Sequence, residues 1–555
     1  MTRLLARARL AVASTALALM ATGLSAQRPR FTHADTLRGS DTPERAWWDV
    51  IFYDLHVQVN PADSSIRGSN AVTYRVLGPA RELQIDLQPP LELDRAEEGG
   101  RALAVRRDGA AYFVAPPLPQ GIGEERTVTV HYHGRWRAGD SSPFYWTTDS
   151  LGAPWIATSD EPLGASSWWP LKDFAADEPD SQRIAITVPD PMVEVSNGRL
   201  RSTRHNEDGT TTYEWFVTEP INSYDVAINA DRNYARFDDS YDGEGGRLSL
   251  TFWPLAYHVD TAKAQFRQTR SMFACFEGWF GPYPWYADGY QLIEAPFLGM
   301  EHQSGIAYGN RYLPGYLGRD LSGTGVGLLW DYIIIHESAH EWWGNSISAR
   351  DHADMWLHEG FAMYAEGLYT ECQQGKDAET RYFVGLRGHI RNDEPIIGRY
   401  GVDDVPDSQD RYYKGANMLH TVRQIIDDDA TWRRILRGAN ATFRHQTVWG
   451  AQIIDYVSRE AGIDLHPVFA QYLTTTDIPV LEYALSPTTL TYRWTHVVEG
   501  FAMPVRVTLD EAGGYALIRP TAAWQTIPAH LRSASDFRVD PNFYVQTKPV
   551  GGGAP

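Results

Sequence analysis

The chain has 555 residues, which is too long for one hydrophobic core and long enough for about two to four domains. Hydrophobic residues make up 43% and charged residues 22%, and these globular values exclude a disordered chain. The formal net charge of −20 at pH 7 argues against nucleic acid or an anionic membrane surface as the main partner.

Residues 1–26 have the composition of an export signal. Arginines occupy three of the first nine positions, and residues 10–24 form an apolar run rich in Ala and Leu. This run is shorter than the roughly 20 residues that span a bilayer, so we do not expect it to persist as an anchor. We expect cleavage near Ala26, no stable membrane insertion afterwards, and a periplasmic or extracellular location.

The hydrophobic period of the remaining chain changes several times. Apolar residues alternate over 53–59, 71–76 and 127–132, as in strands, whereas the period becomes helical from about Asp260. This succession predicts an α+β protein of several domains. We expect a flexible lead-in over 27–45, an all-β domain of sandwich type over 46–232, a mainly helical domain over 233–476, a small β domain over 477–546 and a disordered tail over 547–555.

The helical domain carries the strongest local patterns. Apolar stripes predict helices over 261–280, 325–345, 357–373, 413–428 and 448–461. The first of these should end at Gly281, which a proline follows.

The two cysteines, Cys275 and Cys372, are too few for a disulfide framework. We expect two buried, unpaired thiols that behave as small hydrophobic groups. A single disulfide between them is the alternative.

The central motif is His-Glu-Ser-Ala-His at residues 336–340, which fits the pattern His-Glu-x-x-His. Three consecutive isoleucines precede it, so a buried helix is expected there. Histidines four positions apart project from one helical face, so His336 and His340 can chelate one ion. Glu337 then lies beside that ion, where it can take a proton from water. The alternative is a helix with two hydrogen-bonded histidines and a salt-bridged glutamate.

A catalytic zinc needs a third protein ligand and one open position. Eighteen residues separate His340 from Glu359, which begins a second helical pattern. The rival arrangement with a third histidine six positions after the second fails, because Ser346 stands there. His358 points about 100° away from Glu359 around a helix, so we expect only Glu359 to face the metal. His352 is expected to lie in a loop.

Three further segments accompany this motif. They are residues 158–162 (Thr-Ser-Asp-Glu-Pro), residues 298–302 (Leu-Gly-Met-Glu-His) and residues 411–415 (Arg-Tyr-Tyr-Lys-Gly). Together with the metal motif they resemble the gluzincin aminopeptidases of family M1, which include aminopeptidase N and leukotriene A4 hydrolase. The resemblance extends to about Leu473. It matches a short form without the large C-terminal helical domain of bigger relatives, and it therefore implies a more open cleft.

The resemblance implies a thermolysin-like catalytic domain with one Zn²⁺ per chain. Its zinc ligands would be His336, His340 and Glu359, with Glu337 as the catalytic base. Tyr412, rather than its neighbour Tyr413, would stabilise the oxyanion of the tetrahedral intermediate.

The resemblance also implies a site for the free amino group of the substrate. Glu301 and Glu161 would bind this ammonium, because two carboxylates can hold it by charge-assisted hydrogen bonds. The main chain at Gly299 and Met300 would pair with the substrate as an added strand.

Three positions depart from the family pattern in or near these segments. His302 and His358 each replace an Asn, and Ser159 replaces a Gln that the family often carries. None of the three is a predicted zinc ligand or the predicted base. They bear on how the amine pocket is built, and so on how strictly the enzyme is an exopeptidase.

The sequence therefore predicts an exported zinc metallopeptidase that removes N-terminal residues from peptides with a free amino terminus. Two alternatives stay open. The first is a zinc endopeptidase or an epoxide hydrolase on the same scaffold. The second is a catalytically inactive, secreted binding module, which the loss of a ligand, the base or the tyrosine would indicate.

Overall fold

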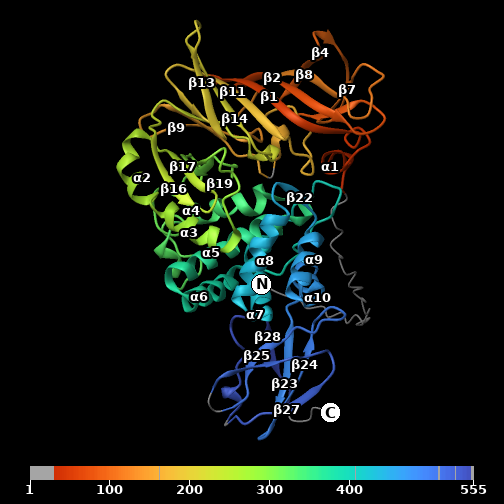
Figure 1. Ribbon diagram of the computed structural model, residues 1–555, viewed down its shortest axis with the longest axis vertical. Helices are drawn as coiled ribbons and strands as arrows, with labels where there is room; N and C mark the ends of the chain where they lie inside the picture. Colours follow the sequence, from red (N-terminus) through yellow and green to blue (C-terminus); the bar gives the residue numbers. More distant parts are fainter. Residues whose placement is uncertain (1–30, 162, 407, 511–512, 532, 552–555) are drawn as a thin grey trace, which may run out of the picture.

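The computed structural model describes residues 31–161, 163–406, 408–510, 513–531 and 533–551. The predicted export signal and the last four residues of the predicted tail lie outside these ranges. Sheets of the N-terminal part, a block of helices and a final group of strands follow one another along the long axis (Figure 1). In the described part of the chain, no helix is long and apolar enough to span a bilayer.

The N-terminal part is built on an eight-stranded sheet, in the order β13-β14-β11-β1-β2-β8-β4-β5. Buried and partly exposed residues alternate along β1, as expected for a strand with one face on the core. The strands of this sheet are β1 (Trp48–Asn60), β2 (Ser65–Val76), β4 (Glu92–Glu98), β5 (Arg101–Ala102), β8 (Glu125–Arg135), β11 (Ser181–Pro189), β13 (Arg199–His205) and β14 (Thr210–Val217).

Two smaller sheets complete this part and close its core. One contains β3 (Leu83–Asp86), β7 (Ala111–Ala115) and β6 (Ala104–Asp108). The other contains β12 (Val193–Val195), β15 (Asn229–Asp231), β10 (Pro154–Thr158) and β9 (Phe144–Thr148). One apolar core, rich in buried tryptophans such as Trp48, Trp168 and Trp169, lies between these sheets.

The helical part begins with a five-stranded sheet, in the order β16-β17-β18-β20-β19. Its strands are β16 (Phe237–Gly243), β17 (Gly246–Trp253), β18 (Tyr290–Glu294), β19 (Gly299–Met300) and β20 (Ile306–Tyr308). β19 is one of the two edge strands, opposite β16, and among the described strands it pairs only with β20, in antiparallel orientation. One side of its backbone is therefore free to pair with another chain.

In Figure 1, α2 (Val259–Gln265) lies beside this sheet and the other helices lie below it. These others are α3 (Gln268–Phe280), α4 (Tyr332–Ala339), α5 (Trp356–Gln374), α6 (Lys376–Leu386), α7 (Asp410–Ile426), α8 (Asp429–Thr442), α9 (Gly450–Ala461) and α10 (His466–Thr474). Two short strands, β21 (Ile347–Ala349) and β22 (Gln446–Val448), pair beside them. The predicted helices over 357–373, 413–428 and 448–461 are confirmed within about three residues as α5, α7 and α9.

Two predicted helices are broken in the structure. The helix predicted over 261–280 is two helices, α2 and α3, which the apolar period could not separate. The helix predicted over 325–345 is a short 3-10 turn, then α4, and then a wide turn over Glu341–Asn345. Trp343 and Gly344 have non-helical torsion angles in this turn, and Gly344 has a φ of 132°, which favours glycine.

The longest helix, α5, crosses α7 where two glycines face each other. A Cβ atom built on Gly415 would lie 3.1 Å from the Cα atom of Gly360. The small residues allow the two helix backbones to approach closely. This crossing brings the first turn of α7 over the first turn of α5, where the candidate site lies.

The expectation of two buried, unpaired thiols is wrong. Cys275 on α3 and Cys372 on α5 form a disulfide, with their Cα atoms 6.1 Å apart. Cys372 is exposed near the end of its helix. The two residues are 97 positions apart, so only the packing of α3 against α5 makes the pair.

The flexible lead-in predicted over 27–45 is also wrong for residues 31–45. This segment contains α1 (His33–Gly39), which begins with a capping box between Thr32 and Asp35. Arg45 is fully buried, and its guanidinium donates a hydrogen bond to Asp86 at 2.5 Å. The lead-in is therefore packed against the first domain.

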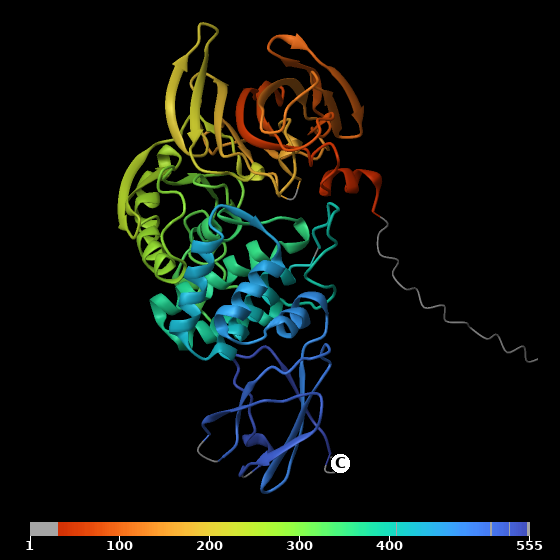
Figure 2. The same ribbon diagram turned by 45° about the vertical axis from the view of Figure 1, so that its right-hand side comes forward.

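The last part of the chain is a set of short strands below the helices, and the turned view in Figure 2 shows it apart from the N-terminal sheets. One sheet has the order β27-β24-β23-β28, and a separate hairpin pairs β25 with β26. The strands are β23 (Val480–Leu485), β24 (Thr489–Thr495), β25 (Val505–Thr508), β26 (Tyr515–Ile518), β27 (Gln525–Pro528) and β28 (Gln546–Pro549). The tail predicted from residue 547 is wrong as far as Pro549, because β28 pairs with β23.

Candidate metal centre and active site

The metal motif lies on α4, a helix whose every residue is buried. Asp331 caps its N-terminus by accepting hydrogen bonds from the backbone amides of Ile333 and Ile334. The same carboxylate also accepts a hydrogen bond from Tyr308 at 2.7 Å. These bonds fix the start of the helix, and therefore the direction in which His336 projects.

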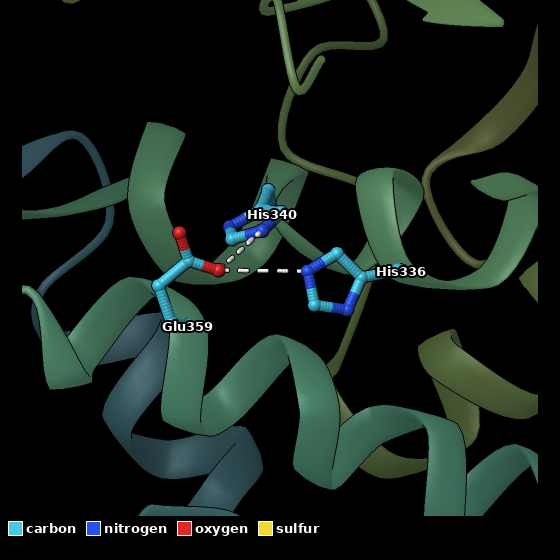
Figure 3. Close-up of side chains that lie close together, drawn as sticks. All are labelled: His336, His340 and Glu359. Carbon is cyan, nitrogen blue, oxygen red and sulfur yellow. Dashed lines mark ion pairs between the residues drawn. The ribbon is translucent and has the colours of Figure 1, made fainter. Parts of the chain in front are cut away.

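The three predicted ligands converge on one point (Figure 3). The Nε2 atoms of His336 and His340 each lie 3.5 Å from Oε2 of Glu359. One ligand atom from each residue lies within 4.8 Å of the other two. Glu359 is in the first turn of α5, and all three residues are at most 4% exposed.

The hydrogen bonds around the three residues leave the ligand atoms available for a metal ion. His336 donates from Nδ1 to Glu366 at 2.6 Å, and His340 donates from Nδ1 to the carbonyl of Trp343 at 3.1 Å. In the neutral imidazoles this leaves each Nε2 atom with a lone pair for a metal ion. Oε2 of Glu359 is buried and has no hydrogen-bond donor among the described residues. Two imidazoles and one carboxylate fit a catalytic zinc site.

Sequence reasoning missed Glu366, which lies seven positions after Glu359 on the same face of α5. It is fully buried, and it also accepts a hydrogen bond from the hydroxyl of Tyr382. The seven-residue spacing is the signal that could have identified it. Glu366 orients the ring of His336, so it contributes to the metal site without contacting the ion.

We expect Glu366→Ala to weaken zinc binding by about 10- to 100-fold, because the ring of His336 loses the partner that holds it. Glu366→Gln should lose much less, because the amide oxygen can still accept from Nδ1. Zinc affinity can be measured by competition with a chromogenic chelator. Equal affinities for Glu366→Ala and the unmodified protein would contradict this role.

Glu337 projects from α4 into an open cavity of about 510 Å³. The lining of this cavity includes Leu298, Tyr316, His336, Tyr412 and Tyr413. Burial raises the pKa of Glu337 to about 7, and the nearby Glu301 carboxylate adds to the increase. A carboxylate with a pKa near neutrality is well matched to general base catalysis.

Gly299 on the edge strand approaches Glu337 closely. A Cβ atom at this position would lie 2.7 Å from Oε1 of Glu337 and 2.8 Å from the side chain of Ile333. Only glycine leaves room for the backbone of β19 beside this carboxylate. The edge strand and the predicted base therefore border the same space.

The structure separates the two neighbouring tyrosines on α7. The hydroxyl of Tyr412 donates to Oε1 of Glu359 at 2.6 Å, and its ring stacks on His336. The ring of Tyr413 instead stacks on His389, with centroids 4.8 Å apart. Burial raises the pKa of Tyr412 well above its ordinary value, so its hydroxyl remains protonated and can donate. Of these two tyrosines, Tyr412 is the one that contacts predicted ligands.

Glu301 follows the edge strand and lies beside the metal site. One oxygen of Glu301, one of Glu337 and a ring nitrogen of His340 lie within 4.8 Å of one another. The hydroxyl of Tyr224, from the N-terminal domain, donates to Glu301 at 3.3 Å. The role of Tyr224 was also missed, because only the packing of the two domains brings it to the site.

Glu161 comes from the N-terminal domain and lines a pocket together with Tyr224 and His358. Burial and then the carboxylate of Glu301 raise the pKa of Glu161 well above its ordinary value. The two predicted amine-binding carboxylates are therefore close enough to influence each other across the domain interface. The guanidinium of Arg411 opposes this increase in the pKa of Glu161.

The three departures from the family pattern lie around this interface. Nε2 of His358 accepts a hydrogen bond from the backbone amide of Ala349 at 2.9 Å, so this ring does not face the metal site. His302 is fully buried, and its ring nitrogens have no partner among the described residues. Burial lowers the pKa of His302 to about 3. The backbone amide of Ser159 donates a hydrogen bond to the carbonyl of Pro143. His352 lies on a short 3-10 turn and pairs with Asp403.

The fold and the site together are those of a metallohydrolase whose buried candidate metal site consists of two histidines and one glutamate. Comparison with protein families supports and sharpens this class. Residues 50–224 match the peptidase M1 N-terminal domain, and residues 265–472 match the peptidase family M1 domain. The chain belongs to peptidase family M1, and it is a hydrolase of the metallo-aminopeptidase group.

Curated relatives cover most of the same region. Human aminopeptidase B is 24% identical over 497 residues, which are 79% of this chain and 71% of that protein. Human glutamyl aminopeptidase is 26% identical over 345 residues, which are 57% of this chain and 34% of that protein. These identities are too low to indicate which substrates this chain prefers.

Solved structures show the same fold. The M1 zinc metallopeptidase of Deinococcus radiodurans superposes with a TM-score of 0.64 at 21% identity, covering 78% of this chain and 94% of that one. A mutant of the same protein, bound to a Tyr-Ser-Ala substrate, also has a TM-score of 0.64, at 20% identity. At these identities the likeness establishes the fold alone.

Proposed function

We propose that the protein is a zinc-dependent aminopeptidase that removes N-terminal residues from peptides. The observation that carries this proposal is the position of Glu301. Its buried carboxylate lies beside Glu337 and His340, at the end of an edge strand that can pair with a peptide. An exopeptidase needs such a carboxylate close to the reacting centre, because the ammonium group of its substrate is one residue from the scissile bond.

Binding of the substrate begins at the edge strand β19. A peptide that pairs with Gly299 and Met300 places its amino group towards Glu301. Glu161 faces the same position from the N-terminal domain, so two carboxylates can share one ammonium. Their burial strengthens the attraction, because water screens it little.

The chain's own residues handle the protons of the reaction. A bound Zn²⁺ supplies Lewis acidity for the scissile carbonyl and lowers the pKa of water. Glu337 takes the proton from the attacking water and returns it to the leaving amine. The hydroxyl of Tyr412 donates a hydrogen bond to the oxygen on which negative charge develops. Glu366 and the carbonyl of Trp343 hold the two imidazoles in their orientations.

Removal of the metal should abolish activity. We expect dialysis against a chelator to remove about one zinc ion per chain and to eliminate hydrolysis of leucine amide. Added Zn²⁺ should restore the activity, while the circular dichroism spectrum of the protein should change little. Full activity of a protein shown to be metal-free by atomic emission would refute the proposal.

Export of the protein is part of the same proposal. The apolar run of residues 10–24 supports it, and so does the disulfide between Cys275 and Cys372, because disulfides persist in oxidising compartments. Mass spectrometry of the protein from a periplasmic or culture fraction should find a mature chain that begins near Gln27. A chain found only in the cytoplasm with residues 1–26 intact would contradict it.

A further inference from the structure

The first helix, α1, precedes both domains that match the family, and it is fixed on the N-terminal one. Nη1 of the buried Arg45 donates hydrogen bonds to the carbonyls of Arg38 and Ser40, at 2.8 and 2.9 Å. Nε2 of the buried Gln84 donates to the carbonyl of Leu37 at 3.1 Å. The carbonyls at the end of the helix therefore have partners in the protein, and these partners set the position of α1.

α1 also contacts the catalytic domain, at the loop over 398–406 that leads towards α7. The backbone amide of Asp403 in this loop donates to the carbonyl of Asp35 at 3.0 Å, and Nε of Arg38 lies 3.1 Å from the Asp403 carboxylate. A Cβ atom on Gly39 would lie 2.0 Å from the backbone of the loop, so glycine allows the two backbones to approach this closely. The helix therefore bridges the two domains.

The same guanidinium reaches the loop that carries Glu161, Leu163 and Gly164, here called the Glu161 loop. Nη2 of Arg38 donates a hydrogen bond to the carbonyl of Leu163, two positions after Glu161. This contact needs a glycine at the next position, because a Cβ atom on Gly164 would lie 2.7 Å from Nη2. The planar fork of Arg38 thus joins the Glu161 loop of one domain to Asp403 of the other.

Both loops border the candidate amine site. Glu161 from the Glu161 loop and Val405 from the 398–406 loop line the same narrow pocket as Tyr224. The hydroxyl of Tyr224 in turn donates to Glu301. Arg38 is not part of the described lining of this pocket. A bound substrate would therefore meet Glu161 but not Arg38.

We propose that Arg38 is a positioning residue, which holds Glu161 within reach of the substrate ammonium through its bond to the Leu163 carbonyl. Asp403 fixes the guanidinium from the catalytic domain, so the position of Glu161 depends on both domains. The inference rests on the proposed aminopeptidase function, since that function gives Glu161 its role. Glu161 lies on a loop, and a loop carboxylate binds a cation more tightly when its position is set before the substrate arrives.

A double-mutant cycle with Glu161→Gln tests this role, because a residue that acts through Glu161 becomes redundant once that carboxylate is gone. With the zinc-loaded full chain, we expect Arg38→Ala to lower kcat/KM for leucine amide by about tenfold, mainly through a higher KM. In the Glu161→Gln background the same substitution should cost less than about twofold. An equal loss in both backgrounds, or no loss from Arg38→Ala alone, would overturn the inference and leave the proposed function intact.

Arg126→Ala is the matched control. Arg126 pairs with Glu98 and Glu124 within the N-terminal domain, and its side chain is 20% exposed, against 23% for Arg38. Its removal should leave kcat/KM within about twofold.

If Arg38→Ala does not fold, Arg38→Lys takes its place in the cycle, because lysine keeps the charge but lacks the planar fork. A loss from Arg38→Lys that persists undiminished in the Glu161→Gln background would contradict the assignment. Failure of the unmodified enzyme to cleave leucine amide would instead overturn the proposed function, and the inference with it.

Discussion

Glu337→Gln should lower kcat by at least about 10³-fold while zinc stays bound. The amide keeps the size and the hydrogen-bonding reach of the carboxylate, but it cannot take a proton from the attacking water. His336 and His340 lie on the same helix and keep their partners, so the metal content should remain about one ion per chain. Hydrolysis of leucine amide and metal analysis of the same sample are the measurements.

A matched control for this variant is Glu371→Gln. Glu371 lies on α5 and pairs with Arg423, away from the metal site. This substitution should leave kcat within about threefold, because Glu371 contacts none of the candidate ligands and its amide oxygen can still accept a hydrogen bond from Arg423. If Glu337→Gln retained more than about a tenth of the activity, Glu337 would not be the base.

The second large effect concerns Tyr412 and its neighbour. We expect Tyr412→Phe to reduce kcat by about 10²- to 10³-fold with KM changed little, because a donor to the developing negative charge is lost. Tyr413→Phe should have a much smaller effect, since the ring of Tyr413 stacks on His389 and its hydroxyl contacts no predicted ligand. Steady-state kinetics of both variants, with zinc content as the control, decide between them.

A reversed order of the two effects would contradict the assignment of the oxyanion donor. If Tyr412→Phe lost its zinc, the fall in kcat would not by itself show that an oxyanion donor had been removed. Tyr412 donates to Glu359, so such a loss would show that the hydroxyl mainly holds this ligand in place.

The grouping of the three candidate ligands was predictable because most of its geometry is local. Two histidines four positions apart on a helix must share a face, and this determines most of the arrangement of His336 and His340. Glu359 followed from the spacing and from the need for a third ligand. The structure places all three within reach of one ion, and it turns His358 away as the helical geometry predicts.

The residues that were not predicted depend on contacts between distant parts of the chain. Tyr224 and Glu301 are 77 positions apart and meet only because the N-terminal domain packs on the helical one. The disulfide joins two helices whose packing the apolar pattern does not reveal. Glu366 carried a local signal, its seven-residue spacing from Glu359, but a glutamate on a helix is usually exposed.

The end of α4 could not be predicted from the apolar pattern either. α4 is buried on all sides, so its apolar residues have no periodic face that marks where it ends. The turn at Gly344 ends it, and that turn carries the carbonyl of Trp343 to Nδ1 of His340. The early end of the helix therefore helps to orient the ring of His340.

The most direct test of the account compares a peptide with its N-acetylated form on the zinc-loaded enzyme. Acetylation removes the positive charge that Glu301 and Glu161 are proposed to bind, and it changes nothing at the scissile bond. We predict that kcat/KM falls by at least about 100-fold, the loss of two charge-assisted hydrogen bonds. Equal cleavage of the free and the acetylated peptide would contradict an aminopeptidase and favour a zinc endopeptidase.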